Sequence, residues 1–297
     1  MKKITYFVLL TGLFLINGTI SAQADLKTNQ DKASDWTAGT YLREALNNTL
    51  SKAIIVNHQT NFTFREGTTF LTAFLTKGEK ISYPVTLQAY HKYAFIGSGD
   101  NDLKNCRLYL QKGGKTYAKD TEEDKTALVT FTPMESGTYQ LVYELVDGHS
   151  PQSFITLALM IENAGYDISA DELDEAINRI IGFGSLIDQQ FGAKIHDQKG
   201  QWSLYGTLLL PGTKITINQL KSHDGKHYAI AAGPSNLIDA DLQIIDQTSG
   251  KTIKEDRKND ATPAVVFFGQ DNKFYQLTVI NVKSNGPAIV MTLLLDD

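Results

Sequence analysis

The sequence predicts a mainly β protein built from two tandem antiparallel β-sandwich units, each with an N-terminal amphipathic helix. One observation behind this is an internal repeat: Gly114–Asp120 returns as Gly250–Asp256, and Tyr139 and Tyr275 follow the two copies at equal spacing. In addition, apolar residues recur at helical spacing before each copy, and alternate with period two in the remainder of each half. A repeat that carries apolar core positions predicts a repeated fold.

Residues 1–24 have the layout of a cleaved secretory signal, with two lysines near the start, the apolar run Tyr6–Ile16 and a small-residue site ending at Ala24. The run is shorter than the roughly 20 apolar residues that span a bilayer, which favours cleavage over a retained anchor. We expect cleavage after Ala24, with Ala22 as the alternative. A flexible tail over residues 25–35 and a secreted or periplasmic mature protein without a membrane span would follow.

The mature chain divides into two units, residues 36–162 and 163–297. Each has the size of an ordinary domain and is expected to bury a core of its own, so one core running through both units would contradict this organisation. The formal charge of the sequence is −5, and its lysines and arginines form no cluster. These features argue against nucleic acid or anionic lipid and leave an unknown protein or polysaccharide as the partner.

An amphipathic helix is predicted at the start of each unit. The first covers about Thr40–Asn57, and the second begins at Ser169, whose hydroxyl can accept from the Glu172 amide while the glutamate reaches back. Gly182 and Gly184 weaken the second helix and let it bend or approach a sheet closely. Each helix is expected on its own sandwich, with packing of the helices against each other as the alternative. The two apolar stripes are Leu42, Ala45, Leu46, Leu50, Ala53 and Ile54, and Leu173, Ala176, Ile177, Ile180, Gly184, Ile187 and Phe191.

Seven short strands are predicted after each helix. Turn signals such as Lys112-Gly113-Gly114 and Asp224-Gly225 separate them. Strands of this length and spacing favour an antiparallel sandwich, in which each sheet needs only one apolar face. They are predicted near residues 68–75, 81–87, 93–97, 106–111, 127–131, 137–146 and 153–161, and near 202–210, 214–220, 227–232, 241–246, 264–268, 274–282 and 288–295.

Motifs in both units share a pattern of an apolar strand, a Gly-Lys turn, a later aspartate and a tyrosine that opens another strand. They are Asp239–Asp246, Ser249–Lys251, Asp256 and Tyr275–Val279 in the second unit, and Arg107–Leu110, Gly114-Lys115, Asp120 and Pro133–Tyr139 in the first. This pattern resembles the bacterial pre-peptidase C-terminal domain. The resemblance implies two jelly-roll-like sandwiches of a kind that accompanies secreted enzymes and aids binding, secretion or solubility. It covers neither helix, and no peptidase domain is attached.

Cys106 is the only cysteine, so no intramolecular disulfide can form. It lies on a predicted strand and aligns with Leu242 of the repeat, which indicates a small buried core residue. No histidine is placed near it in a shared motif, and a nucleophilic role is therefore not predicted.

The aspartates Asp239, Asp241, Asp256 and Asp260 could converge at one end of the second sandwich, where their carboxylates would suit calcium. The first unit keeps aspartates at only two of the four positions, so hydrogen bonding within turns is the preferred interpretation. The acidic segment Gly97–Asp102 lacks the spacing of an EF-hand loop, and we expect it to be a solvated loop.

His223 and His227 flank the predicted turn Asp224-Gly225 and could share a zinc ion. The sequence shows no third or fourth ligand, so exposed hairpin histidines are the preferred interpretation.

The sequence indicates no catalytic residues, no cofactor and no metal ligands. Gly182–Leu186 lacks the final glycine of a nucleophile elbow, and Ile187 replaces the third glycine of a dinucleotide fingerprint. Glu122 and Glu123 belong to a charged loop. An enzyme would need a site assembled from distant positions.

Aromatic side chains offer another candidate surface. An exposed row of rings could stack on sugar or peptide, although ordinary sheet side chains are the preferred interpretation, and Trp202 is expected in the core. The candidate row consists of Tyr83, Tyr90, Tyr93, Tyr109 and Tyr117.

The sequence therefore predicts a secreted or periplasmic, non-catalytic accessory or binding protein. Two alternatives stay open. One is a structural or assembly protein of the bacterial envelope with a protein partner, and the other is a hydrolase with an unrecognised site.

Overall fold

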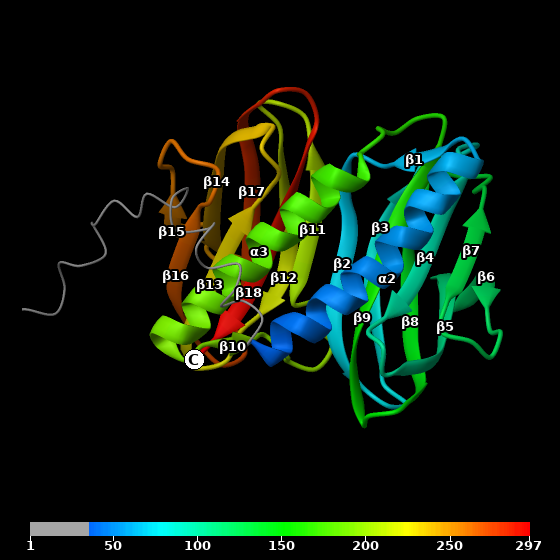
Figure 1. The fold of residues 1–297 in the computed structure, drawn as a ribbon, viewed down its shortest axis with the longest axis horizontal. Coiled ribbons are helices and arrows are strands. Elements are labelled where there is room, and N and C mark those ends of the chain that lie inside the picture. Colours follow the sequence, from blue (N-terminus) through cyan, green and yellow to red (C-terminus); the bar gives the residue numbers. More distant parts are fainter. Residues whose placement is uncertain (1–35) are drawn as a thin grey trace, which may run out of the picture.

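The computed structural model describes residues 36–297. The predicted signal peptide, residues 1–24, and the predicted tail, residues 25–35, lie outside the described residues. The described part is mainly β, with several antiparallel sheets in a sandwich-like arrangement and two helices (Figure 1). Neither helix has the combination of length and apolar composition needed to cross a membrane.

Every predicted strand is present, and the structure adds β1, β6, β10 and β15. β1 and β10 are too short to show an apolar alternation. β6 and β15 lie at sheet edges and carry charged residues, which obscures the alternation. The first half contains α2 (Thr37–Gln59), β1 (Phe62–Phe64), β2 (Gly67–Thr76), β3 (Lys80–Leu87), β4 (Tyr93–Gly99), β5 (Leu103–Lys112), β6 (Lys115–Asp120), β7 (Ala127–Phe131), β8 (Gly137–Gly148) and β9 (Gln152–Glu162). The second half contains α3 (Ala170–Phe191), β10 (Lys194–Ile195), β11 (Leu204–Leu209), β12 (Lys214–Lys221), β13 (Gly225–Ala232), β14 (Leu237–Asp246), β15 (Thr252–Asp256), β16 (Ala264–Gly269), β17 (Phe274–Ser284) and β18 (Ala288–Asp296).

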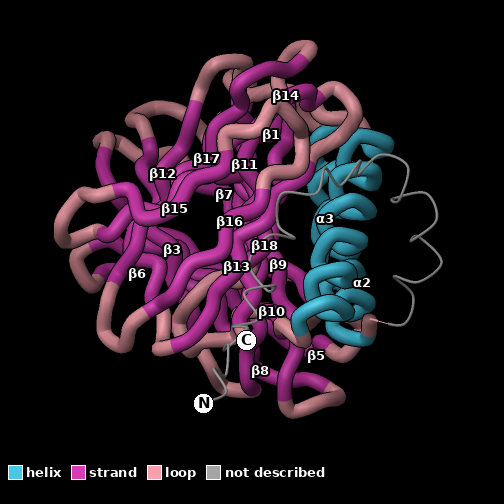
Figure 2. Tube along the Cα trace, turned by 90° about the vertical axis from the view of Figure 1, so that its left-hand side faces the viewer, coloured by secondary structure: helices cyan, strands magenta, loops and turns pink. Residues whose placement is uncertain are grey.

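One large sheet runs through both halves. Its strand order is β16-β13-β18-β11-β2-β9-β4-β7, and the antiparallel pair of β2 and β11, with Leu71 opposite Tyr205, joins the halves. Two smaller sheets have the orders β3-β8-β5-β6 and β12-β17-β14-β15. Both helices lie along one side of the strands (Figure 2). The protein therefore has three layers: small sheets, large sheet and helices.

The core between the large sheet and the small sheets is continuous. A single cluster of buried apolar side chains includes Leu71 and Leu157 of the first half together with Tyr205 and Leu294 of the second. The expectation that each unit buries its own core is therefore wrong. Because β2 and β11 are hydrogen-bonded neighbours, their inner-face side chains lie side by side and leave no solvent boundary between the halves.

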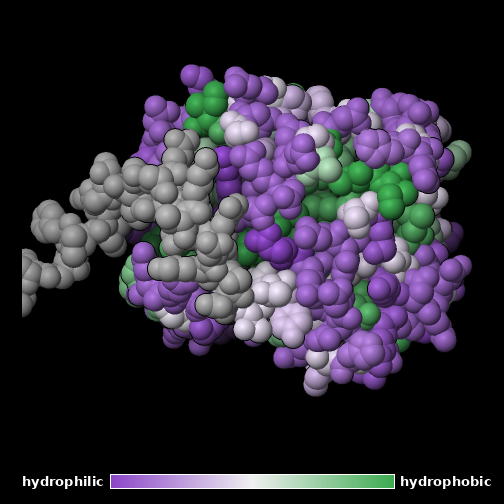
Figure 3. Space-filling view, in the orientation of Figure 1, coloured by the Kyte–Doolittle hydropathy of each residue, from purple (hydrophilic) through white to green (hydrophobic). Residues whose placement is uncertain are grey.

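A second apolar layer separates the large sheet from the helices. α2 contacts β9 and β4, α3 contacts β18 and β13, and the helices also touch each other, with Arg43 donating to the Asn178 side chain. Both packing alternatives therefore occur together. Most of the predicted stripe residues are buried, but Phe191 is 51% exposed and its ring stacks on Tyr228. The surface of this side of the molecule is mostly hydrophilic, with apolar patches between polar side chains (Figure 3).

The predicted capping box at the start of α3 is confirmed. The Glu172 amide donates to Ser169 Oγ over 3.2 Å, and the Ser169 amide donates to Glu172 Oε2 over 3.0 Å. Gly184 permits the close approach expected of it, because a Cβ there would lie 2.6 Å from Trp36 Cη2 and 2.9 Å from Leu293 Cδ2.

Both tryptophans lie where the halves meet. Trp36 precedes α2 and packs against Gly184 of α3. Trp202 precedes β11, is buried as predicted, and donates from Nε1 to the Ser82 carbonyl of β3 over 3.1 Å. Each indole thus belongs to one half and contacts the other.

Candidate functional site

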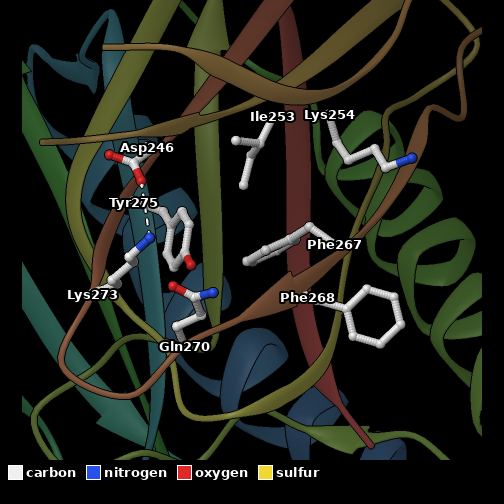
Figure 4. Close-up of a pocket in the computed structure, with 8 residues that line it drawn as sticks. All are labelled: Asp246, Ile253, Lys254, Phe267, Phe268, Gln270, Lys273 and Tyr275. Carbon is white, nitrogen blue, oxygen red and sulfur yellow. Dashed lines mark ion pairs between the residues drawn. The ribbon is translucent and has the colours of Figure 1, made fainter. Parts of the chain in front are cut away.

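A pocket of about 210 Å³ lies at the outer edge of the second half. It forms where β15, an edge strand of a small sheet, contacts β16, an edge strand of the large sheet. Ile253, Phe267 and Tyr275 converge there, and Gln270 and Lys273 lie beside the tyrosine (Figure 4). The complete lining consists of Asp246, Ile253, Lys254, Phe267, Phe268, Gln270, Lys273 and Tyr275.

The apolar part of this pocket is fixed by strand alternation. Phe267 and Tyr275 point into the sandwich, are 4% and 2% exposed, and have ring centroids 5.3 Å apart at an interplanar angle of 58°. Ile253 lies at a β-bulge, where the register between β14 and β15 shifts. A bulge re-aims one side chain relative to its neighbours, and this one directs Ile253 towards the two rings.

Charged and amide groups surround the apolar part. Lys273 Nζ lies 3.6 Å from Asp246 Oδ2, and the amides of Thr248 and Ser249 donate to Asp246 Oδ1. The amide of Ser249, followed by weaker effects that include the charge of Lys273, lowers the pKa of Asp246. The pocket therefore combines ring-packing surfaces with fixed hydrogen-bonding groups, which is the usual composition of a ligand site.

A larger hollow of about 540 Å³ lies at the C-terminal end of β2. Its lining includes Phe74, Lys77 and Lys80. Two of its three lysines are paired, with Lys77 Nζ 2.5 Å from Asp147 and Lys80 Nζ 3.3 Å from Glu144. We place the candidate site in the smaller pocket, because buried aromatic rings form its walls.

A buried histidine–aspartate group lies directly behind the pocket. The ring of His227 stacks on Phe267 at 5.2 Å, and its Nδ1 donates to Asp296 Oδ1 over 2.6 Å. The other oxygen of Asp296 accepts from His196 Nδ1 over 2.7 Å. His227 belongs to β13 and Asp296 to β18, where the two face each other in register, and His196 follows β10.

The hydrogen bonds define the protonation of His227. Nδ1 faces a carboxylate and Nε2 faces the carbonyl of His223 at 2.9 Å; both are acceptors, so both ring nitrogens must carry protons. Burial lowers the pKa of His227, but its bonds to Asp296 and His223 and the charges of Asp296 and Asp297 outweigh burial and raise it. Burial likewise opposes ionisation of Asp296, yet its two histidine partners hold its pKa well below the ordinary range.

This group corrects the expectation for the hairpin histidines. His227 is 4% exposed and His223 is half-buried, so they are not exposed hairpin side chains. In the described part of the chain, His196, His227 and Asp296 are the one set of three potential metal ligands with donor atoms within 4.8 Å of one another. Because each histidine Nδ1 lies at hydrogen-bond distance from an oxygen of Asp296, 2.7 Å for His196 and 2.6 Å for His227, the geometry fits an ion pair better than a metal centre.

Hydrogen bonding within turns is confirmed for Asp256 and Asp260, but not for Asp239, whose Oδ1 is buried without a hydrogen-bond partner. Asp256 accepts from the amides of Lys258 and Ala264, and Asp260 accepts from the Thr262 amide. Asp120 does the same in the first half, from the amides of Glu122 and Leu128. The four candidate calcium ligands do not form a ligand group among the described residues.

The expectation of a solvated loop over Gly97–Asp102 is wrong at its centre. Gly97 and Gly99 belong to β4, and Asp100 is 2% exposed. Its carboxylate accepts from the amides of Asp102 and Phe154, which ties the end of β4 to β9. Burial raises the pKa of Asp100 to about 6, against the lowering effect of these two hydrogen bonds.

The five candidate tyrosines do not form one row. Tyr83 contacts Trp202 inside the protein, Tyr93 is buried, and Tyr109 donates to Glu144. Tyr90 is 74% exposed and stands apart, and Tyr117 packs against rings of its own half.

The other weighed residues have structural surroundings. Cys106 is buried as predicted, and burial raises the pKa of its thiol to about 12, so it stays protonated. Ser185 is buried within α3. Glu122 and Glu123 are exposed in the loop after β6.

Comparison with known proteins adds little to this geometry. No family model and no curated protein match the chain. Among solved structures, the M60 catalytic domain with two CBM51 domains from Clostridium perfringens ZmpB shares 8% identity at a TM-score of 0.25, covering 77% of this chain and 36% of that one. A CBM22 tandem from Paenibacillus barcinonensis Xyn10C shares 8% identity at a TM-score of 0.20, covering 78% and 98%. The PBSX exported protein XepA shares 10% at a TM-score of 0.23, covering 78% and 86%. Similarities at this level carry no argument about function.

Proposed function

We propose that this protein is a secreted or periplasmic, non-catalytic binding protein whose ligand site is the pocket between Ile253, Phe267 and Tyr275. The observation that carries the proposal is the combination of buried aromatic walls with a polar rim at an open sheet edge. Such a pocket suits a ring-bearing group of a protein or polysaccharide partner. The pocket supports the proposal. The idea of two independent binding modules does not support it, because the two halves share one core.

We further propose that each half is a jelly-roll-like unit with its own leading helix. What supports this is the strand order, which is β2-β9-β4-β7 over β3-β8-β5-β6 in the first half. The second half repeats both orders in its own numbering, β11-β18-β13-β16 over β12-β17-β14-β15. Two four-stranded antiparallel sheets in this arrangement are typical of a jelly roll.

A hydrolase is less well supported. The strongest pair for it is Ser98 and Lys52, whose Oγ and Nζ lie 3.3 Å apart, and burial and then Lys125 lower the pKa of Lys52. However, Ser98 is 1% exposed and its hydroxyl donates to the Lys125 carbonyl. A buried hydroxyl committed to another acceptor is not presented to a substrate.

The test is capture of partners from bacterial envelope extract and from a panel of soluble polysaccharides. A Gln270→Ala/Lys254→Ala variant should lose at least ~10-fold in retained partner, since it removes polar contacts at the rim. Gln140→Ala, which changes an exposed glutamine of the first half, should bind like the wild type. Equal capture by the double variant would place the binding surface elsewhere, and turnover of a substrate would contradict the non-catalytic role.

A further inference from the structure

The two halves differ at one corresponding position that decides whether the pocket exists. In both halves the edge strand of the small sheet carries a bulge: the register shifts between Leu110 and Gln111 opposite β6, and between Ile244 and Ile245 opposite β15. The residue at the first bulge is Tyr117, and the residue at the second is Ile253.

In the first half the tyrosine ring occupies this place. Tyr117 meets Phe131 at 5.9 Å and 71° and Tyr139 at 5.5 Å and 82°, both edge-to-face arrangements. Lys115 Nζ lies 5.1 Å from the Tyr117 ring centroid, and Lys112 Nζ lies 4.9 Å from that of Tyr139. The site thus packs a phenol ring that is 43% exposed against two aromatic rings, with one ammonium group near its negative face.

In the second half the same walls are present without the ring. Phe267 pairs with His227 across β16 and β13 as Phe131 pairs with Tyr93 across β7 and β4. Tyr275 lies near the start of β17 as Tyr139 lies near the start of β8. Ile253 is shorter than tyrosine, and the space is the pocket of about 210 Å³. Lys254 and Lys273 also line it, although they align with Ala118 and Gly137 of the first half and not with its lysines.

We propose that this pocket binds a phenol-type aromatic ring, presented as a tyrosine side chain by a protein partner. This deepens the proposed function and rests on it. The partner's ring takes the place that Tyr117 has in the first half, between Phe267 and Tyr275, with Lys273 beside it and Lys254 at the rim (Figure 4). The same chain supplies both versions of the site, one occupied by its own side chain and one open.

The proposal is tested with p-cresol, which is the tyrosine side chain as a free molecule, by NMR titration of the full protein. We expect millimolar binding with shifts at Ile253 and Tyr275. Ile253→Tyr should weaken binding at least ~10-fold by filling the pocket, with Ile253→Phe as a second blocking variant should tyrosine not be accommodated. Val282→Tyr adds the same ring at an exposed position of β17 and should bind p-cresol like the wild type.

Tyr117→Ile provides the converse test, since it should open a second p-cresol site in the first half. A tetrapeptide containing tyrosine should bind more tightly than p-cresol, and its glycine counterpart should not bind. Stronger binding of p-cresol than of the peptide would assign the pocket to a free phenol and overturn the protein-partner part.

Different binding results would overturn the phenol assignment and the proposed function. Binding of methyl glycosides at Ile253 without binding of p-cresol would overturn the phenol assignment and leave a binding protein. Unchanged p-cresol affinity in both blocking variants would also overturn it. Absence of p-cresol, glycoside and envelope-partner binding would overturn both.

Discussion

His227 has two hydrogen-bond acceptors and no free nitrogen, which makes it an imidazolium paired with Asp296. A raised histidine pKa stabilises the fold below the ordinary value near 6.5, and this contribution is lost as pH rises through the folded pKa. A lowered aspartate pKa stabilises above the ordinary value near 3.9 and is lost as pH falls through the folded pKa. The pair therefore contributes most between these limits.

We predict that Asp296→Asn lowers the free energy of unfolding by about 3 to 5 kcal/mol near pH 5.5, because it leaves a buried cation unpaired. The difference from wild type should shrink as pH rises through the raised pKa of His227, since the imidazolium then loses its proton. Urea unfolding at pH 5.5 and 8.5 measures this, with imidazole NMR reporting the His227 pKa. Glu123→Gln, in the exposed loop after β6, is the carboxylate-to-amide control and should have little effect. An equal loss at both pH values for Asp296→Asn would contradict the ion-pair assignment.

The sequence pointed to His227 but to neither His196 nor Asp296, and it did not indicate the pocket. His223 and His227 are near neighbours, but His196 and Asp296 lie 100 positions apart along the chain. They meet because β10 and β13 both pair with β18. No local spacing encodes such a meeting, so a histidine expected to be exposed is buried. The tyrosine-to-isoleucine exchange at the bulge was visible within the repeat, but its consequence depends on the walls that packing supplies.

At the scale of elements, α3 is the one whose start the sequence specifies best. The box at Ser169 and Glu172 satisfies amide groups that would otherwise be unpaired at the helix start. α2 has no side-chain cap, and its N-cap position is Trp36. Packing determines the position of α2, so its predicted boundaries fell three residues short at the start and two residues short at the end.

We predict that Ser169→Ala lowers the free energy of unfolding by about 1 kcal/mol, the usual cost of losing such a cap. Chemical denaturation followed by far-UV circular dichroism measures it. Ser51→Ala changes an exposed serine within α2 and is the matched control, expected to be neutral or slightly stabilising because alanine favours helices. A similar effect of both substitutions would show that the cap does not hold α3.

At the scale of the whole molecule, the pairing of β2 with β11 joins the halves into one sheet with one continuous core. Gly206 of β11 lies so close to the neighbouring strands that a Cβ would be 2.7 Å from Phe70 Cδ2 and 3.1 Å from Met291 Sδ. Both tryptophans report on this arrangement, because Trp36 contacts α3 and Trp202 hydrogen-bonds to β3.

We predict a single unfolding transition in which tryptophan fluorescence and circular dichroism coincide. Gly206→Val should lower stability by about 1 to 3 kcal/mol through overpacking, and hydrogen exchange should speed up equally in both halves. Gly137→Ala is the control, since a Cβ there meets only the flexible end of Lys112. Two separate transitions, or faster exchange confined to β11 and its own half, would show that the halves fold independently.

The sequence by itself determined the elements: the two helices, most strands, the capping box, the buried cysteine and the aspartate turns all follow from local periodicity and local hydrogen bonding. Only the tertiary structure decided how the halves combine. A repeat encodes the same apolar faces twice. It does not determine whether two edge strands pair, because pairing uses backbone N–H and C=O groups that nearly every residue has. Joining β2 to β11 merged the cores, the contact between β15 and β16 created the pocket, and the pairing of β10 and β13 with β18 created the buried ion pair.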